Sequence, residues 1–364
     1  MLPSQIPETE GIKYAGSKRK LLPYIAQMVS GLEVSRVLDG FSGTTRVSQL
    51  FSQMGFDTIA SDRSAWSEIL GQCYLLNTHP AEHYLPILQH LNTLPGYDGW
   101  FTEHYGGDVG DSVKRPFQRK NTRKLDAIRD EIDRLSLSHL ERAVILTSLM
   151  LALDSIDNTL GHFVSYLAGW STRSYRDLSL RIPRLYASAG QHSVVREDIF
   201  ATLQNQRFDL AYFDPPYGSN NEKMPPSRVR YSAYYHLWTT LVLHDQPAVF
   251  GKANRREDSR DQVAGSPFED FRLDASGRSL ALQALTRLIQ ETQARYILLS
   301  YSSGGRATWD ELSEQLAQAG KILKVMTLDH KRHVMSHMHW TQAWTQAKTG
   351  QHLEYLFLLE KYAE

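Results

Sequence analysis

The segment 208–213 (FDLAYF) is an apolar run that ends directly at Asp214 and two consecutive prolines, Pro215 and Pro216. Proline lacks a backbone N–H and cannot continue a hydrogen-bonded ladder. We therefore interpret the run as a buried strand that must end before the two prolines. Strand-like runs separated by helical patterns such as 279–293 predict an α/β fold with a doubly wound sheet. These further runs lie at 36–40, 56–62, 296–301, 323–328 and 354–360.

This alternation is interrupted between residues 71 and 190, where the periodicity is mainly helical. Apolar residues recur at spacings of three and four, which makes one stripe along a helix, and 141–157 is a second helical candidate. We therefore predict a helical insertion over 71–190 in an α/β domain built from 1–70 and 191–364. The stripe consists of Leu125, Ile128, Ile132 and Leu135.

Composition narrows the class of protein further. Among 364 residues, 40 Lys and Arg balance 40 Asp and Glu, which excludes a uniformly basic surface but allows a local basic groove. The single cysteine, Cys73, excludes an internal disulfide and a cysteine-based zinc site. The longest near-continuous apolar stretch, 143–153, is shorter than the roughly 20 residues that span a bilayer, and residues 1–10 show no signal-peptide pattern. We expect a cytoplasmic protein with no membrane partner.

Residues 37–43 (VLDGFSG) place two glycines where a strand turns into a helix. At the carboxyl edge of a parallel sheet, such a turn lets the backbone approach a nucleotide, and Asp62 ends the next strand, where an acid can hold a ribose. A plain strand–helix turn with a surface aspartate has the same pattern, so the glycines alone leave both readings open. The P-loop and G-x-G-x-x-G spacings are absent, which disfavours a nucleotide hydrolase and a dinucleotide site.

The segment Asp214-Pro-Pro-Tyr217 suits chemistry on the exocyclic amine of a nucleobase, whose lone pair is delocalised into the ring. The Asp214 carboxylate can accept one N–H and the Pro215 carbonyl the other, which favours a localised lone pair. Pro216 makes the turn rigid, and Tyr217 can stack on a base that has left the helix. The alternative is a proline turn with aspartate as a local cap, but the position at the end of a buried strand favours the functional interpretation.

Taken together, these segments resemble the Dam-like class of adenine-specific DNA methyltransferases, which use S-adenosylmethionine (AdoMet). Residues 14–21 (YAGSKRKL) are similar to the N-terminal cofactor motif of that class, 39–43 to its glycine-rich motif, and 214–217 to its catalytic motif. The order of the motifs, with an insertion before the third, is also that of the class. One departure is Thr44-Thr45, where many relatives carry a second glycine or small residue.

The resemblance implies a Rossmann-like methyltransferase sheet, with the helical insertion as the target-recognition domain. It implies catalysis by Asp214, Pro215, Pro216 and Tyr217. It also implies AdoMet contacts from Tyr14, Gly16, Lys18, Asp39, Phe41, Gly43, Asp62, Asp198 and Asp214.

The implied reaction is transfer of the AdoMet methyl to the 6-amino group of an adenine flipped out of double-stranded DNA. The resemblance further implies a prokaryotic cytoplasmic enzyme, associated with the nucleoid when bound to DNA, with a cognate restriction endonuclease as a candidate partner. Two other interpretations stay open. One is the same chemistry on a cytosine amino group, a ribosomal RNA base or a protein glutamine. The other is a non-catalytic DNA-binding subunit on the same fold.

Two basic regions are candidate DNA contacts. The segment 114–124 (KRPFQRKNTRK) contains no acid, and its cations suit phosphate contacts, although a solvated helix start has the same pattern. The long segment 218–272 interleaves arginines with aromatic residues, which suggests a clamp over a flipped base, whereas the spacing of Tyr234, Leu237 and Leu241 suggests a packed helix. The predicted DNA contacts are Lys114, Arg115, Arg119, Lys120, Arg123, Lys124, Arg228 and Arg230.

A histidine cluster near the C-terminus is the last feature with chemical potential. No nearby carboxylate completes a ligand set, and methyl transfer from a sulfonium needs no metal. We therefore expect no metal centre. The cluster consists of His330, His333, His337 and His339.

Overall fold

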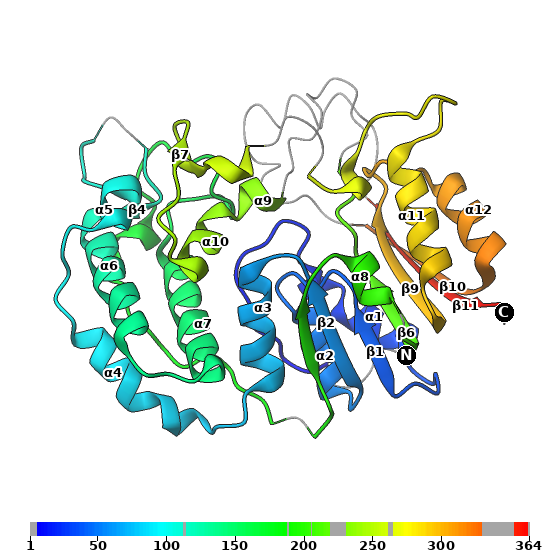
Figure 1. Cartoon of the computed structure of the whole chain (residues 1–364), viewed down its shortest axis with the longest axis horizontal. Coiled ribbons are helices and arrows are strands. Elements are labelled where there is room, and N and C mark those ends of the chain that lie inside the picture. Colours follow the sequence, from blue (N-terminus) through cyan, green and yellow to red (C-terminus); the bar gives the residue numbers. More distant parts are fainter. Residues whose placement is uncertain are drawn as a thin grey trace.

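A computed structural model of the chain describes residues 6–111, 114–187, 189–204, 206–218, 231–260, 265–329 and 353–362. Its centre is a seven-stranded sheet in the order β10-β11-β9-β6-β1-β2-β5 (Figure 1). β11 runs antiparallel to β10 and β9, and the other neighbouring pairs are parallel. The strands are β1 (Arg36–Asp39), β2 (Asp57–Asp62), β5 (Ser193–Arg196), β6 (Phe208–Phe213), β9 (Ala294–Ser302), β10 (Gly320–Asp329) and β11 (Leu353–Lys361).

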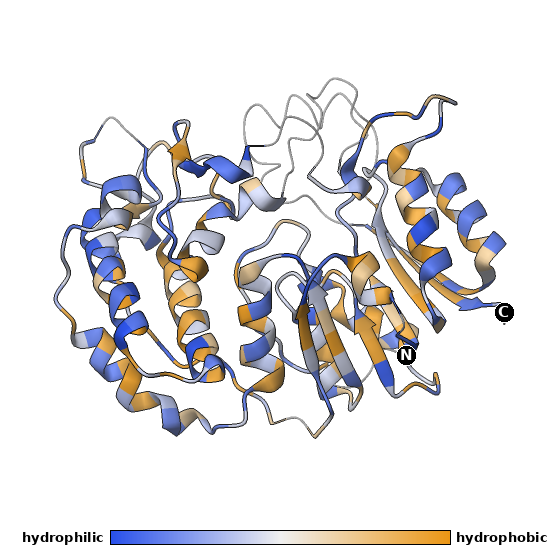
Figure 2. Cartoon of the chain, viewed as in Figure 1, coloured by the Kyte–Doolittle hydropathy of each residue, from blue (hydrophilic) through white to orange (hydrophobic). Residues whose placement is uncertain are grey.

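Helices cover both faces of this sheet. Alternate residues of β6 point to opposite faces: Leu210 and Tyr212 pack with α1 (Leu22–Val29) and α2 (Arg46–Gln53). Ala211 and Phe213 pack with the helices of the other face, which are α8 (Ile199–Leu203), α11 (Leu280–Glu291) and α12 (Trp309–Ala319). Figure 2 shows apolar residues concentrated on the central strands and on the inward sides of these helices. The predicted α/β fold is confirmed.

A helical lobe lies beside the β2–β5 side of the sheet (Figure 1). α3 (Ala65–Gly71) packs against β5 and also against α7 (His139–Ile156), so it joins the lobe to the sheet. α7 is apolar around most of its circumference because neighbouring helices surround it. The lobe contains α4 (Leu85–Thr93), α5 (Trp100–Tyr105), α6 (Arg119–Arg134), α7 (His139–Ile156) and α10 (His236–Leu243).

The remaining elements are short. Among them, a single π-helical turn continues α3, and α9 precedes α10. They are η1 (Lys18–Lys20), η2 (Gln72–Leu76), η3 (Ala81–Tyr84), β3 (Gly106–Gly107), β4 (Phe117–Gln118), η4 (Thr172–Tyr175), α9 (Tyr231–Tyr234), β7 (Val249–Phe250), β8 (Arg255–Arg256), η5 (Glu257–Ser259) and η6 (Pro267–Glu269). No helix in the described ranges is both long and apolar enough to cross a membrane.

The structure differs from the expected organisation in three places. β5 was not predicted, because its four residues are too few and too exposed to give a strong pattern. The predicted insertion is helical only as far as Ile156, and 157–190 is largely irregular, with η4 as its one helical turn among described residues. α10 comes from the predicted long loop, yet it packs into the lobe, with Leu237 and Leu241 buried as their helical spacing predicted.

Candidate active site

The carboxyl ends of β1, β2 and β6 bring three aspartates to one edge of the sheet. Asp39 is the last residue of β1 and pairs with Tyr212, two residues before Asp214. Asp62 is the last residue of β2, and its Oδ2 accepts a hydrogen bond from the Gly43 N–H (2.9 Å). Parallel strands place their carboxyl ends together, so segments far apart in the sequence meet here, at the point where the strand order reverses.

A narrow cleft at this edge is lined by most of the residues predicted to bind the cofactor. Its free volume is about 20 Å³. Asp62 stands behind the glycine turn instead of lining the cleft, and Asp198 does not line it either. The lining residues are Tyr14, Gly16, Ser17, Lys18, Asp39, Phe41, Ser42, Gly43, Thr44, Arg46, Val47, Tyr212 and Asp214.

The aspartates of the cleft are buried acids. Asp39 is 1% exposed, and burial raises its pKa to about 7, although a hydrogen bond from the Ser48 hydroxyl (2.5 Å) opposes the shift. The other Asp39 oxygen, Oδ1, has no hydrogen-bond partner among the described residues. Burial also raises the pKa of Asp62. Acids in this state favour a cationic partner, because its charge stabilises their ionised form.

Lys18 sits between two carboxylates at the base of the site. Its Nζ lies 2.9 Å from Asp214 Oδ1 and 2.6 Å from Glu354 Oε1, which also accepts a hydrogen bond from the Ser300 hydroxyl (2.8 Å). Burial lowers the pKa of Lys18, but Asp214 and Glu354 outweigh it, so that this pKa lies above its usual value. Burial raises the pKa of Asp214 to about 7; Lys18 lowers it and Glu354 raises it further.

Aromatic rings hold the N-terminal segment over the cleft. Tyr14 stacks on Tyr235 with 4.7 Å between ring centroids and on Tyr231 with 5.3 Å. The Ala15 N–H donates to the Tyr235 hydroxyl (2.6 Å). Gly16 has a φ of +85°, and a Cβ there would lie 3.3 Å from the Tyr231 hydroxyl, so a larger residue would strain this turn.

A larger cavity of about 660 Å³ adjoins the cleft and shares Tyr14, Gly16, Ser17 and Arg46 with it. Tyr217 and Tyr231 contribute one wall. The helical lobe contributes the other, through Asp154, Arg173 and the segment 159–162. Because α7 ends at Ile156, Gly161 belongs to this cavity-lining segment and does not cap the helix.

Asp198 lies apart from the other predicted cofactor residues. Its carboxylate caps α8 by accepting the Phe200 N–H (3.0 Å), its side chain is 46% exposed, and Arg63 lies 3.9 Å away. Contact between Asp198 and AdoMet therefore stays a prediction.

Most predicted DNA-binding cations of the segment 114–124 have acidic or carbonyl partners within the chain. Lys114 and Arg115 have no ion pair in the described part of the chain, and Arg228 and Arg230 lie outside the described residues, as do His330, His333, His337 and His339. The partners are Asp108 for Arg119 (2.8 Å), Asp177 for Lys120 (2.5 Å), Asp98 for Arg123 (3.4 Å) and the Asn92 carbonyl for Lys124.

The sequence motifs did not point to Glu354, which is the second carboxylate partner of Lys18 beside Asp214. The signal was present: an acid stands inside the apolar run 353–359 (LEYLFLL) of a strand that the sheet buries. Glutamate is almost never fully buried without a partner, and Glu354 is 3% exposed.

The mostly parallel sheet with one antiparallel strand brings the glycine turn beside the Asp-Pro-Pro-Tyr turn, which is consistent with the fold of an AdoMet-dependent methyltransferase. A family model described as D12 class N6 adenine-specific DNA methyltransferase matches residues 14–269, and the chain belongs to this family. It is therefore a transferase that methylates adenine in DNA, which confirms the resemblance to the Dam-like class. The matched range contains every predicted site residue, whereas Glu354 lies beyond it.

The chain is also similar to several restriction–modification methyltransferases. It is 26% identical over 325 residues to Type II methyltransferase M.NlaIII of Neisseria lactamica, covering 87% of this chain and 91% of the relative. It is 26% identical to Modification methylase StsI of Streptococcus sanguinis (84% and 46%) and 23% identical to Type II methyltransferase M.FokI of Planomicrobium okeanokoites (96% and 53%). The chain thus spans about half the length of the latter two.

Proposed function

We propose that the chain transfers the methyl group of AdoMet to the 6-amino group of an adenine flipped out of double-stranded DNA. The observation that carries this proposal is the cleft itself. Three distant segments, 14–18, 39–47 and 212–214, supply its lining, and Asp214 stands at its inner end. The cleft thus suits the cofactor, and the larger cavity beside it suits the flipped base.

The donor set of the cleft fits AdoMet. When bound, AdoMet supplies an electrophilic methyl group on a sulfonium, and it carries a second positive charge on its amino group. Asp39 Oδ1, which has no hydrogen-bond partner among the described residues, suits that ammonium. Asp62 stands behind the glycine turn, where its carboxylate accepts from Gly43 and Ser64, so it would meet the ribose hydroxyls once the cleft widens. Gly43, with a φ of +47°, keeps the turn free of a side chain. The cleft is narrower than the whole cofactor, so its lining must widen when AdoMet binds.

Asp214 and Pro215 would hold the target amine. The carboxylate accepts one amino N–H and the Pro215 carbonyl the other, so that the nitrogen lone pair points to the methyl group. Pro216 keeps the carbonyl in place, and Tyr217, which lines the larger cavity, stacks on the base. Formation of the nitrogen–methyl bond would be balanced by cleavage of the methyl–sulfur bond, so that the positive charge would pass from the sulfonium to the amine. The Asp214 carboxylate would stabilise that charge, and it would lie next to the proton that the amine then loses to solvent.

Lys18 and Glu354 act on Asp214 as positioning residues. Lys18 contacts the Asp214 oxygen Oδ1 and also Glu354, whose carboxylate accepts a hydrogen bond from the Ser300 hydroxyl. Burial raises the pKa of Asp214 to about 7, because Lys18, which opposes the shift, is shared with Glu354. This arrangement leaves Asp214 ionised above about pH 7 and able to accept both hydrogen bonds and positive charge.

We propose that the region 71–190, helical as far as Ile156, recognises DNA in a chain whose catalytic domain consists of 1–70 and 191–364. The supporting observation is that Asp154, Arg173 and the segment 159–162 share the larger cavity with Tyr217. A flipped base would therefore meet both regions. For the proposed clamp over 218–272, the supporting contact is the stacking of Tyr231 and Tyr235 on Tyr14; residues 219–230 and 261–264 lie outside the described residues.

The biological setting is proposed from the DNA substrate and the names of the relatives. We propose that the chain acts in the cytoplasm of a prokaryote, at the nucleoid, alongside a cognate restriction endonuclease. DNA modified by the chain should then resist one endonuclease of the source cell, and unmodified DNA should be cut.

The mechanism is tested by Asp214→Ala, assayed for labelled-methyl transfer and, separately, for DNA binding. We expect transfer to be lost and most of the binding to be kept. Normal turnover by this variant would overturn the role of Asp214.

A further inference from the structure

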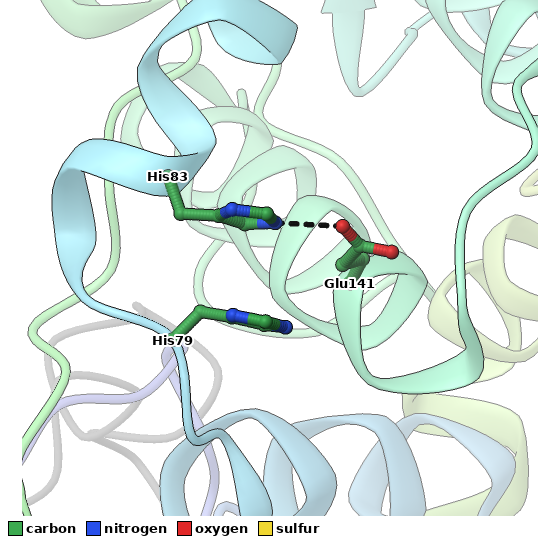
Figure 3. Close-up of side chains that lie close together, drawn as sticks. All are labelled: His79, His83 and Glu141. Carbon is green, nitrogen blue, oxygen red and sulfur yellow. Dashed lines mark hydrogen bonds and ion pairs between the residues drawn. The ribbon is translucent and has the colours of Figure 1, made fainter.

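A separate cluster of metal-ligating side chains lies on the surface of the helical lobe (Figure 3). His79 and His83 stack with 4.1 Å between ring centroids and 12° between planes. His83 Nε2 lies 2.7 Å from Glu141 Oε1. One ligand atom from each of the three residues falls within 4.8 Å of the others, and Figure 3 shows both rings extending toward the carboxylate.

We propose that His79, His83 and Glu141 bind a divalent transition-metal ion of the zinc type. Two imidazoles and one carboxylate are a common donor set for Zn²⁺, with water as the fourth ligand of a tetrahedron. Two neutral imidazoles and one carboxylate carry a net charge of −1, which a divalent cation compensates. Imidazole donors also select against Mg²⁺ and Ca²⁺, which prefer oxygen ligands.

The distances require only a small adjustment. Metal bonds of about 2.0–2.1 Å place tetrahedral donors about 3.3 Å apart. His83 and Glu141 are already closer than that, and the largest separation is within 4.8 Å. A shift of about 1.5 Å, most simply by rotation of the His79 ring about its side-chain bonds, would close the site.

Hydrogen bonds restrain the Glu141 carboxylate and the main chain at His79. Glu141 Oε2 accepts the Ser138 N–H (2.8 Å) in the capping box of α7, which leaves Oε1 directed at His83. Asn77 accepts the His79 N–H (3.3 Å) and donates to the His79 carbonyl (2.8 Å). Ligands that are restrained before binding lose less conformational entropy when an ion arrives.

A second His–Glu pair on the same lobe shows what distinguishes this cluster. His90 Nε2 lies 2.7 Å from Glu131 Oε1, the same contact as between His83 and Glu141. Glu131 meets Arg134 (3.6 Å), and among the described residues no second histidine completes a ligand set there. A surface His–Glu pair is therefore not a metal site by itself; His79 makes the difference. The His90 pair serves as a matched control.

An ion in this site would fasten the 77–84 segment to the first turn of α7, because the three ligands come from both. The ligands are absent from the lining of the cleft and of the larger cavity. We therefore expect the metal to act on the stability of the lobe and to leave methyl transfer unchanged.

The test uses the untagged full chain, first stripped with a chelator, and titrates it with Co²⁺ followed by absorption and with Zn²⁺ followed by calorimetry. Wild type and His90→Ala should bind one equivalent of metal ion per chain. His79→Ala and Glu141→Gln should lose this equivalent or bind it at least about tenfold more weakly. Zn²⁺ should raise the Tm of wild type and His90→Ala but not of His79→Ala. Circular dichroism checks folding, and because His79 is exposed, its loss removes only the surface ring contacts with His83 and Tyr84.

Equal binding by all four proteins would overturn the proposal, because the metal would then be held elsewhere in the chain. Absence of any bound equivalent in wild type would overturn it as well.

Discussion

Glu354→Gln gives the sharpest test of how the site controls Asp214. The substitution removes one negative charge but keeps a side-chain oxygen that can still accept from Lys18 and Ser300. Lys18 then has one carboxylate partner instead of two, so the ionised form of Asp214 is favoured and its pKa falls. If the ionised carboxylate is needed for transfer, kcat in wild type rises with pH through about 7, and in the variant it rises at lower pH.

The size of this effect follows from the contacts. Asp214 and Glu354 lie 2.9 and 2.6 Å from the same Nζ, so their contacting oxygens are at most about 5.5 Å apart. At an effective dielectric constant of about 20, two unit charges at that distance repel by about 3 kcal/mol. That energy corresponds to about two pKa units. We therefore expect the acid limb of the pH–kcat profile to move about two pH units toward acid.

The assay measures kcat for methyl transfer at saturating AdoMet and duplex DNA, between pH 4 and 9. The matched control is Glu360→Gln on the same strand, where Glu360 pairs with Arg295 (3.2 Å) at the surface and should leave the profile unchanged. An unchanged inflection in Glu354→Gln, or one displaced toward alkaline pH, would refute the reasoning.

Three further predictions concern the proposed roles of single residues. Asp214→Ala should lower kcat by about 10²-fold or more, measured by labelled-methyl transfer, with DNA affinity within a few-fold of wild type in a gel-shift assay. Gly16→Ala and Gly31→Ala, at φ of +85° and +81°, should each destabilise the fold by about 1 kcal/mol; only Gly16→Ala should weaken AdoMet binding by calorimetry, and equal binding by both would contradict the assignment. Replacing Lys114 and Arg115 together by alanine should reduce the salt dependence of DNA binding by about two in slope, and an unchanged slope would exclude both from phosphate contact.

Much of the fold could be predicted because its strands are short apolar runs with marked ends. The prolines after β6 and the glycines after β1 fix where these strands stop, and both stops lie at the site. β5 could not be predicted, because its residues are partly exposed and form no apolar run. The irregular path of 157–190 was not predictable either, since its hydrogen bonds go to side chains far away in the sequence, such as Asn121 and Asn92.

Only those parts of the site that belong to short local sequence motifs could be predicted. Tyr14, Lys18, Asp39 and Asp214 belong to local motifs, and the structure brings them to one cleft. Glu354 reaches Lys18 across 336 positions of sequence, and only the pairing of β11 with β9 places it there. Ion pairs that occupy basic residues of the predicted DNA-binding segment depend in the same way on tertiary contacts, because Asp177 lies 57 positions from Lys120.

The central claim is tested most directly by incubating the purified chain with labelled AdoMet and unmethylated genomic DNA, followed by nucleoside mass spectrometry. We expect the label in N6-methyladenine, and sequencing of the modified sites would then give the recognised sequence. Label in the cytosine amino group would keep the fold and the chemistry of the amine but contradict the assigned base. Absence of label in DNA from a protein that binds AdoMet would contradict the account and direct the search to RNA or protein substrates.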